Sequence, residues 1–134
     1  MTNVLPTASG TFGDKPVLTF PEGDAPTGLV VEILEEGTGP VVEAAREIEV
    51  NYLGQTWKGA IFDNSYDRGD TTRFPIGIGM VIGGWDKGLV GRNVGDRVLL
   101  SIPPEHGYGL RGMPAAGIKG TDTLVFVVDI VGVK

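Results

Sequence analysis

The chain has 134 residues, a formal net charge of −6, a single histidine and no cysteine. This length predicts one domain. The missing cysteines exclude disulfides, thiolate nucleophiles and cysteine-ligated metals, and one histidine argues against a catalytic triad or a multi-histidine metal site. An acidic chain is also unsuited to binding nucleic acid or an anionic membrane through its net charge.

The start of the chain has neither the basic residues nor the apolar run of a signal peptide. No apolar stretch approaches the roughly 20 residues of a membrane span. We therefore expect a cytoplasmic protein without a membrane partner. The chain contains 22 glycines and 9 prolines, which favours short strands and many turns over long helices.

The first part of the chain shows little periodicity. Residues 1–16 carry two prolines and two glycines and are expected to form an irregular arm. Residues 17–20 show a weak apolar–polar alternation, which predicts a first short strand. The expected boundary of this region is residue 27. Residues 29–34 (L-V-V-E-I-L) are a strand candidate, which ends at a Gly- and Pro-containing segment.

Residues 48–57 alternate cleanly and predict a half-buried antiparallel strand, with Ile48, Val50 and Tyr52 on one face. Residues 61–66 follow after a turn. Next comes a polar loop, in which we expect an ion pair between Asp63 and Arg68.

Residues 74–89 contain the segment around which we expect the fold to be organised. Its extended apolar part runs from Phe74 into a very short helical candidate that carries Trp85. Trp85, with glycines before it and charged residues after it, is proposed as the floor of an apolar pocket, and its indole N–H needs a partner when buried. The alternative is that Trp85 is an ordinary core residue.

The last third of the chain predicts two more strands. Residues 97–102 end at two prolines, a long Gly- and Pro-rich loop spans residues 105–121, and residues 124–133 form a largely buried strand. No internal repeat is seen, and residues 28–134 are expected to form one domain without a further boundary. The predicted class is α+β, an antiparallel sheet with one short helix.

Five local patterns occur in one order: V-N-Y-L-G (50–54), F-D-N-S (62–65), V-I-G-G-W-D-K-G-L (81–89), I-P-P-E-H-G-Y-G (102–109) and T-L-V-F-V-V-D-I (123–130). Together they resemble the FKBP-type peptidyl-prolyl cis–trans isomerases, in a single-domain, bacterial-like form. The resemblance covers residues 28–134, about four-fifths of the chain. It implies a half-barrel sheet of five to six antiparallel strands wrapped around one short helix.

The resemblance also implies a pocket between helix and sheet. Asp63, Tyr108, Phe62 and Trp85 match the catalytic positions, and the ligand-binding positions are Tyr52, Phe74, Val81, Ile82, Phe126 and, on an overhanging loop, Ile118. Four places on the rim and flap depart from the usual family pattern, namely Thr72, Gly83, Met113 and residues 118–120, which read I-K-G instead of the usual I-P-P. These departures put substrate preference and drug affinity in doubt more than activity.

The implied function is acceleration of X–Pro bond rotation in protein folding, without a cofactor or metal. The implied partners are proline-containing polypeptides and the macrolides tacrolimus and rapamycin. Tyr108 is a candidate donor to the substrate carbonyl, although it could simply cover the Gly-rich loop. Asp63 is expected to orient Tyr52 or to interact with the twisted carbonyl carbon, and its alternative role is that of a turn residue.

Two other functions stay open from the sequence. The same pocket could capture proline-containing segments without turnover, as a binding module. A general folding chaperone is a weaker alternative, because residues 109–121 are too few to hold the inserted domain of chaperone-like family members. We expect a monomer, since no exposed apolar face stands out.

Overall fold

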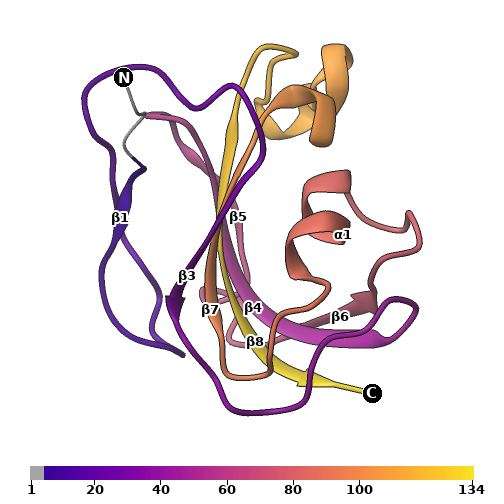
Figure 1. Cartoon of the computed structure of the whole chain (residues 1–134). Helices are drawn as coiled ribbons and strands as arrows, with labels where there is room; N and C mark the ends of the chain where they lie inside the picture. Colours follow the sequence, from indigo (N-terminus) through magenta and orange to yellow (C-terminus); the bar gives the residue numbers. More distant parts are fainter. Residues whose placement is uncertain (1–4) are drawn as a thin grey trace.

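The main sheet of the protein is antiparallel and six-stranded, and it curves around a single helix (Figure 1). The computed structural model describes residues 5–134. The strand order is β3-β7-β8-β4-β5, and β6 pairs with the first half of β4. The strands are β3 Val30–Glu35, β4 Glu47–Thr56, β5 Ile61–Asn64, β6 Thr72–Pro75, β7 Arg97–Ile102 and β8 Leu124–Val133. The predicted α+β class is confirmed, and the ranges expected for β7 and β8 match residue for residue.

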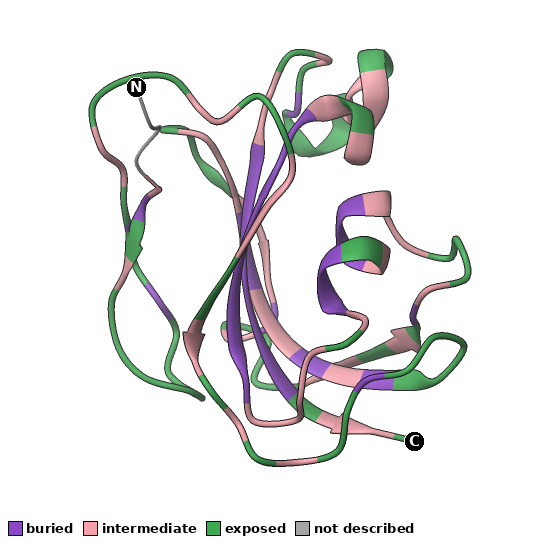
Figure 2. Cartoon of the chain, viewed as in Figure 1, coloured by how far each residue is buried: buried purple, intermediate pink, exposed green. Residues whose placement is uncertain are grey.

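The two central strands are buried on both faces, which explains their almost continuous apolar sequence (Figure 2). Side chains alternate between the two faces of a strand. Phe126 and Val128 of β8 therefore belong to the core cluster beneath the helix, whereas Val125 and Val127 belong to a second cluster on the opposite face. A strand that is buried on both faces has apolar residues at successive positions, so its sequence does not alternate between apolar and polar residues.

Helix α1 (Gly83–Leu89) lies against β7 on the concave side of the sheet. Two of its glycines face the sheet. A Cβ atom at Gly84 would lie 2.6 Å from Cδ1 of Ile102, and a Cβ atom at Gly88 would lie 2.6 Å from Cδ2 of Leu100. The missing side chains let the helix backbone approach the sheet closely, which fixes the depth of Trp85.

The opposite face of the sheet is covered by an N-terminal hairpin, residues 5–19, seen in indigo in Figure 1. Its short strands β1 (Thr7–Ala8) and β2 (Leu18–Thr19) pair with each other, and Leu18 joins the second core cluster. Within the range expected to be an irregular arm, residues 1–16, the structure shows the strand at residues 7–8, and residues 1–4 lie outside the described part of the chain. The hairpin has no clear period because each of its strands is only two residues long.

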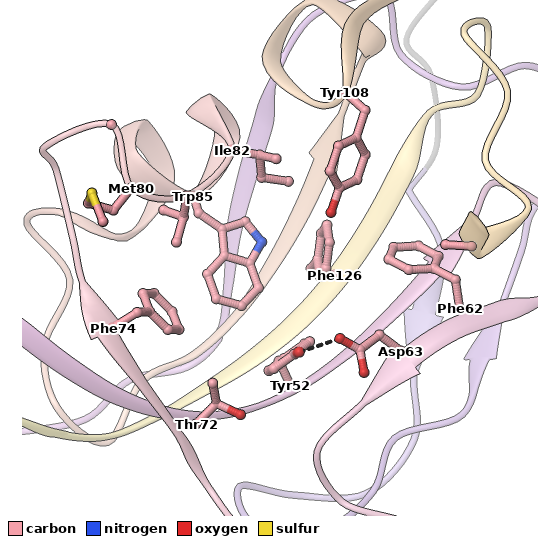
Figure 3. Close-up of a pocket in the computed structure, with 13 residues that line it drawn as sticks. Tyr52, Phe62, Asp63, Thr72, Phe74, Met80, Ile82, Trp85, Tyr108 and Phe126 are labelled. Atoms are coloured by element: carbon pink, nitrogen blue, oxygen red, sulfur yellow. Dashed lines mark hydrogen bonds between the residues drawn. The ribbon is translucent and has the colours of Figure 1, made fainter. Parts of the chain in front are cut away.

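The connection between β7 and β8 contains three 3₁₀ turns, Pro104–His106, Gly109–Arg111 and Pro114–Ala116. The sequence predicted a long loop here, and the loop carries Tyr108 to the helix side of the sheet (Figure 3). Within the described residues, no helix has the length and apolar character needed to cross a membrane.

Candidate functional site

A cavity of about 600 Å³ opens between α1 and the concave face of the sheet. This volume is in the range of small-molecule sites. Its lining comes from β4, β5, β6, β8, the segment before α1, α1 itself and the β7–β8 connection, and consists of Tyr52, Phe62, Asp63, Thr72, Phe74, Gly79, Met80, Val81, Ile82, Trp85, Tyr108, Ala116 and Phe126.

Trp85 forms the floor of the cavity (Figure 3). The residue is only 5% exposed, yet its ring lines the open volume. Ring centroids of Tyr52 and Phe74 lie 5.1 Å from that of Trp85, and the centroid of Phe126 lies at 5.2 Å. The Tyr52 and Phe126 rings meet the indole edge to face, an arrangement that aromatic pairs favour. The three rings therefore hold the indole in one orientation.

The indole nitrogen of Trp85 has no hydrogen-bond partner among the described residues, contrary to the expectation that a buried N–H needs one. An unpartnered buried donor costs free energy. The three aromatic contacts of the ring offset this cost in the folded protein.

Gly54 of β4 makes room for two of the aromatic side chains. A Cβ atom at this position would lie 2.7 Å from Cζ of Phe62 and 2.7 Å from Cε1 of Phe126. Those two rings pack edge to face, with centroids 5.5 Å apart. In the β4 register Gly54 is opposite both Phe126 and Asp63, so this glycine brings an apolar and a polar part of the lining together.

A small polar cluster lies at one edge of the cavity. The Tyr52 hydroxyl donates a hydrogen bond to Oδ2 of Asp63, drawn as a dashed line in Figure 3. Oδ1 of Asp63 lies 2.6 Å from Nη1 of Arg68, so the expected ion pair is confirmed. Arg68 also approaches the Tyr52 hydroxyl at 3.4 Å and donates to Oγ1 of Thr72 at 3.3 Å. Because the side chains of Asp63 and Arg68 are 40% and 48% exposed, this pair contributes orientation rather than much stability.

The loop that carries Arg68 joins β5 to β6 and spans residues 65–71. Its start is fixed to β4, because the Ser65 N–H donates to the Tyr52 carbonyl at 2.9 Å and the Tyr52 N–H donates to Oγ of Ser65 at 2.8 Å. We refer to it as the 65–71 loop.

Tyr108 presents its hydroxyl to the cavity from the opposite side (Figure 3). Burial raises the pKa of Tyr108, and the negative charge of Asp63 raises it further. Burial likewise raises the pKa of Tyr52, as does its hydrogen bond to Asp63. Both phenols thus stay protonated at neutral pH and can donate. Tyr52 already has an acceptor, whereas the Tyr108 hydroxyl has none among residues 5–134.

The apolar segment before α1 is held by a carboxylate of the helix. Asp86 accepts hydrogen bonds from the backbone N–H of Gly77 at 2.6 Å and of Gly79 at 2.8 Å. This fixes the turn that places Val81 and Ile82 on the cavity wall. No group of three or more metal-ligating side chains occurs among the described residues. The arrangement can bind an apolar ring and donate a hydrogen bond to a carbonyl oxygen near it.

Comparison with known proteins identifies the family. Residues 39–131, a range that includes every lining residue, match the family model of the FKBP-type peptidyl-prolyl cis–trans isomerases. The chain belongs to this family. The family resemblance inferred from the sequence is confirmed, and the members of this family are isomerases.

Individual relatives agree with this assignment. The chain is 41% identical over 121 residues to a FK506-binding protein of Streptomyces anulatus, which covers 90% of this chain and 98% of the relative. Solved structures of this family also match the chain. AtFKBP13 matches with a TM-score of 0.72 and 35% identity, over 81% of this chain and 94% of its own. FkpA from Escherichia coli matches with a TM-score of 0.73 and 42% identity, over 81% of this chain and 49% of its own.

Nine of the ten site residues inferred from the FKBP resemblance line the cavity, and Ile118 does not. Ile118 is 3% exposed and packs in the main core cluster. Its backbone pairs with Met113 in both directions, at 2.8 and 3.0 Å, which closes a tight loop. That loop brings Ala116, rather than Ile118, to the cavity.

The structure also adds lining residues that the family motifs did not assign. Met80 and Gly79 lie in a glycine-rich stretch, where sequence gives no periodic signal for the direction of a side chain. Of the positions that depart from the FKBP pattern, only Thr72 lines the cavity. Met113 packs against the core, and Gly83 begins the helix. Relative to the usual family pattern, these departures therefore change one residue of the cavity wall, Thr72.

Proposed function

We propose that this chain catalyses cis–trans isomerisation of X–Pro peptide bonds, with the proline ring bound over Trp85. The observation that supports this most directly is the form of the cavity. It has an aromatic floor and apolar walls, and its polar side chains are confined to the edges. Membership of the FKBP-type isomerase family points to the same activity.

The reaction needs no bond to be made or cleaved. Rotation is slow because amide resonance opposes it, with a barrier of about 18–20 kcal/mol, and uncatalysed X–Pro bonds take tens to hundreds of seconds. A planar amide is strongly dipolar and well solvated, whereas the twisted form has lost much of its charge separation. A dry pocket withdraws solvation mainly from the ground state, and this lowers the barrier.

The polar side chains are assigned supporting roles in this proposal. Tyr108 donates to the carbonyl oxygen of a bound substrate, since its hydroxyl faces the cavity without another acceptor. Asp63, oriented by Tyr52 and Arg68, faces the carbonyl carbon as the bond twists. Each tenfold gain in rate requires about 1.4 kcal/mol, so several modest contacts can combine to a large acceleration.

The same cavity is proposed to bind tacrolimus and rapamycin. Support comes from its volume and from relatives named for binding FK506, which is another name for tacrolimus. Thr72 replaces the aromatic side chain that simple family members often carry, and it reduces the apolar wall on that side. We therefore expect binding, with an affinity set partly by this position.

A protease-coupled assay on an Xaa-Pro-Phe peptide tests both proposals. The protease cleaves only the trans form, so an isomerase accelerates the slow phase, and tacrolimus should abolish that acceleration in proportion to the occupied sites. An unaccelerated slow phase with peptide still bound would instead support the non-catalytic binding module. If the peptide is isomerised faster but tacrolimus does not reduce this acceleration, the isomerase proposal stands and macrolide binding is rejected.

A further inference from the structure

A buried carboxylate lies on the sheet face opposite the cavity, outside the site described above. Asp129 of β8 is fully buried, and its Oδ1 lies 3.0 Å from Nε of Arg97 on β7, which is 1% exposed. The N–H of Nε is not aligned for a hydrogen bond to this oxygen, so the contact is an ion pair. A buried charge requires compensating charges and donors. Here they come from segments far apart in sequence.

The N-terminal hairpin provides one set of partners. The backbone N–H of Gly13 donates to Oδ2 of Asp129 at 2.9 Å. In the other direction, the guanidinium of Arg97 donates to the carbonyl oxygen of Asp14 and, at 3.5 Å, to that of Ser9. The turn of the hairpin is therefore bound to both members of the buried ion pair: it donates a hydrogen bond to Asp129 and accepts hydrogen bonds from Arg97.

The 65–71 loop provides the other partner. The Tyr66 hydroxyl donates to the same Oδ2 of Asp129, at 2.8 Å. A second contact joins the hairpin to this loop directly, because Nζ of Lys15 lies 2.9 Å from Oδ1 of Asp67. Tyr66 also packs against the second core cluster, next to the hairpin. The loop and the hairpin thus share one buried acceptor and one surface ion pair.

Arg68 follows these two residues in the same loop and extends to the other side of the sheet. Its guanidinium contacts Asp63, Tyr52 and Thr72 at the edge of the cavity. A continuous set of contacts therefore leads from the hairpin, through Tyr66 and Asp67, to the polar cluster of the site. The family model begins at residue 39, so the hairpin is outside the part of the chain that it matches.

We propose that the N-terminal hairpin is a positioning element of the isomerase site, acting through Tyr66 and the 65–71 loop on Arg68. The hairpin holds the loop directly through Lys15 at Asp67, and it shares with Tyr66 the acceptor Asp129. These contacts set where the Arg68 guanidinium meets Asp63 and Tyr52. The inference rests on the proposed isomerase function. It makes Tyr66 a positioning residue that touches no substrate.

The competing view is that the hairpin only covers apolar residues of the sheet. Lys15→Met breaks the direct contact between the hairpin and the 65–71 loop, so it should lower kcat/KM if the hairpin positions the loop and leave kcat/KM at the parental value if the hairpin only covers the sheet. A double-mutant cycle then tests whether the effect passes through Tyr66 and Arg68. Tyr66→Phe removes one hydroxyl and keeps the ring in the core. If Tyr66 acts through Arg68, its loss should lower kcat/KM about threefold to tenfold, as expected for coupled neighbours. The same change made in an Arg68→Met background should lower kcat/KM no further.

Glu35→Gln is the matched control, because the amide oxygen can still accept the Phe12 N–H that Glu35 binds at 2.8 Å, so the hairpin keeps its anchor on β3. Its kcat/KM should equal that of the parent. Covering alone predicts a lower unfolding midpoint for Tyr66→Phe with parental kcat/KM, and that result would overturn the proposal. An equal loss of activity with and without Arg68 would overturn it as well.

A second readout distinguishes failure of this inference from failure of the isomerase proposal. The guanidinium resonances of Arg68 in ¹⁵N–¹H spectra report its contacts whether or not the chain is active. Tyr66→Phe should shift and broaden them, while Glu35→Gln should leave them in place. If the parent protein is inactive but Tyr66→Phe still shifts the Arg68 resonances, the positioning role stands and the proposed isomerase activity is rejected. If the resonances are unchanged in Tyr66→Phe, the positioning role is rejected.

Discussion

Tyr108 combines two features that point to a contact with substrate. Its hydroxyl faces the cavity, and no hydrogen-bond partner for it occurs among the described residues. A hydroxyl without an intramolecular partner contributes little to folding, so it can be removed without destabilising the protein. Asp63 differs, because both carboxylate oxygens already have partners in Tyr52 and Arg68.

At this scale we predict that Tyr108→Phe lowers kcat/KM and leaves the unfolding midpoint unchanged. A neutral hydrogen bond is worth about 0.5–1.5 kcal/mol, which corresponds to roughly twofold to tenfold in rate. The coupled peptide assay and urea denaturation measure the two quantities. Leu110→Ala is the control, since Leu110 lies in the same connection, is 93% exposed and does not line the cavity. Parental activity in Tyr108→Phe would remove Tyr108 from the proposed mechanism.

At the scale of elements, the position of α1 depends on small residues. Gly84 and Gly88 are one turn apart and face β7, where Ile102 and Leu100 occupy the space that a Cβ atom would need. Displacing the helix would also move Trp85, whose ring is held from the sheet side by Tyr52 and Phe126. Close helix–sheet packing and the cavity floor therefore depend on the same two glycines.

We predict that Gly88→Ala destabilises the protein by about 1–3 kcal/mol, the usual cost of overpacking a core. This would exceed the gain of up to about 1 kcal/mol in helix propensity. Gly83→Ala is the matched control, because a Cβ atom there meets nothing closer than 3.7 Å, and its stability should be unchanged or slightly higher. Chemical denaturation monitored by fluorescence compares them. Equal stabilities of the two variants would show that the helix can shift outward.

At the scale of the whole molecule, the sheet is buried from both sides, and the three tyrosines of the chain lie in these two layers. Burial raises the pKa of each of them above the ordinary value of 10.0. Asp63 adds to the rise for Tyr52 and Tyr108, and the charge of Asp129 adds to it for Tyr66. The folded chain thus retains three phenolic protons in a range where the unfolded chain loses them.

We predict that stability decreases as the pH rises above about 10, since the unfolded state then binds fewer protons than the folded state. Below this pH the contribution is fully present. Tyrosinate absorbance should appear together with unfolding, and urea midpoints should decrease with increasing pH. In Tyr66→Phe the decrease should be shallower, because one of the three protons is missing. Reversible titration of all three tyrosines near their ordinary pKa in the folded protein would contradict this account.

Two expectations about the whole molecule, a monomeric state and a cytoplasmic location, stay predictions. The same holds for a boundary at residue 27. The hairpin packs on the sheet and hydrogen-bonds to the buried Arg97–Asp129 pair. We therefore expect removal of residues 1–27 to lower the stability of the remaining domain.

The sequence by itself determined the elements whose signal is local. The alternation around Val50, the apolar run from Leu124 and the prolines after Ile102 predicted strands close to those observed, because side-chain direction along a strand follows from its period of two. Motif order was enough to assign the family and nine residues of the cavity lining.

Only the tertiary structure decided the features that depend on distant partners. It placed Ile118 in the core and Ala116 at the cavity, because backbone pairing within a turn directs those side chains. It showed that residues 5–19 form a hairpin held on the sheet, since the hairpin's partners Asp129 and Asp67 are more than 50 residues away in the sequence. Local patterns report which face of an element is apolar, whereas the packing of distant segments decides what covers that face.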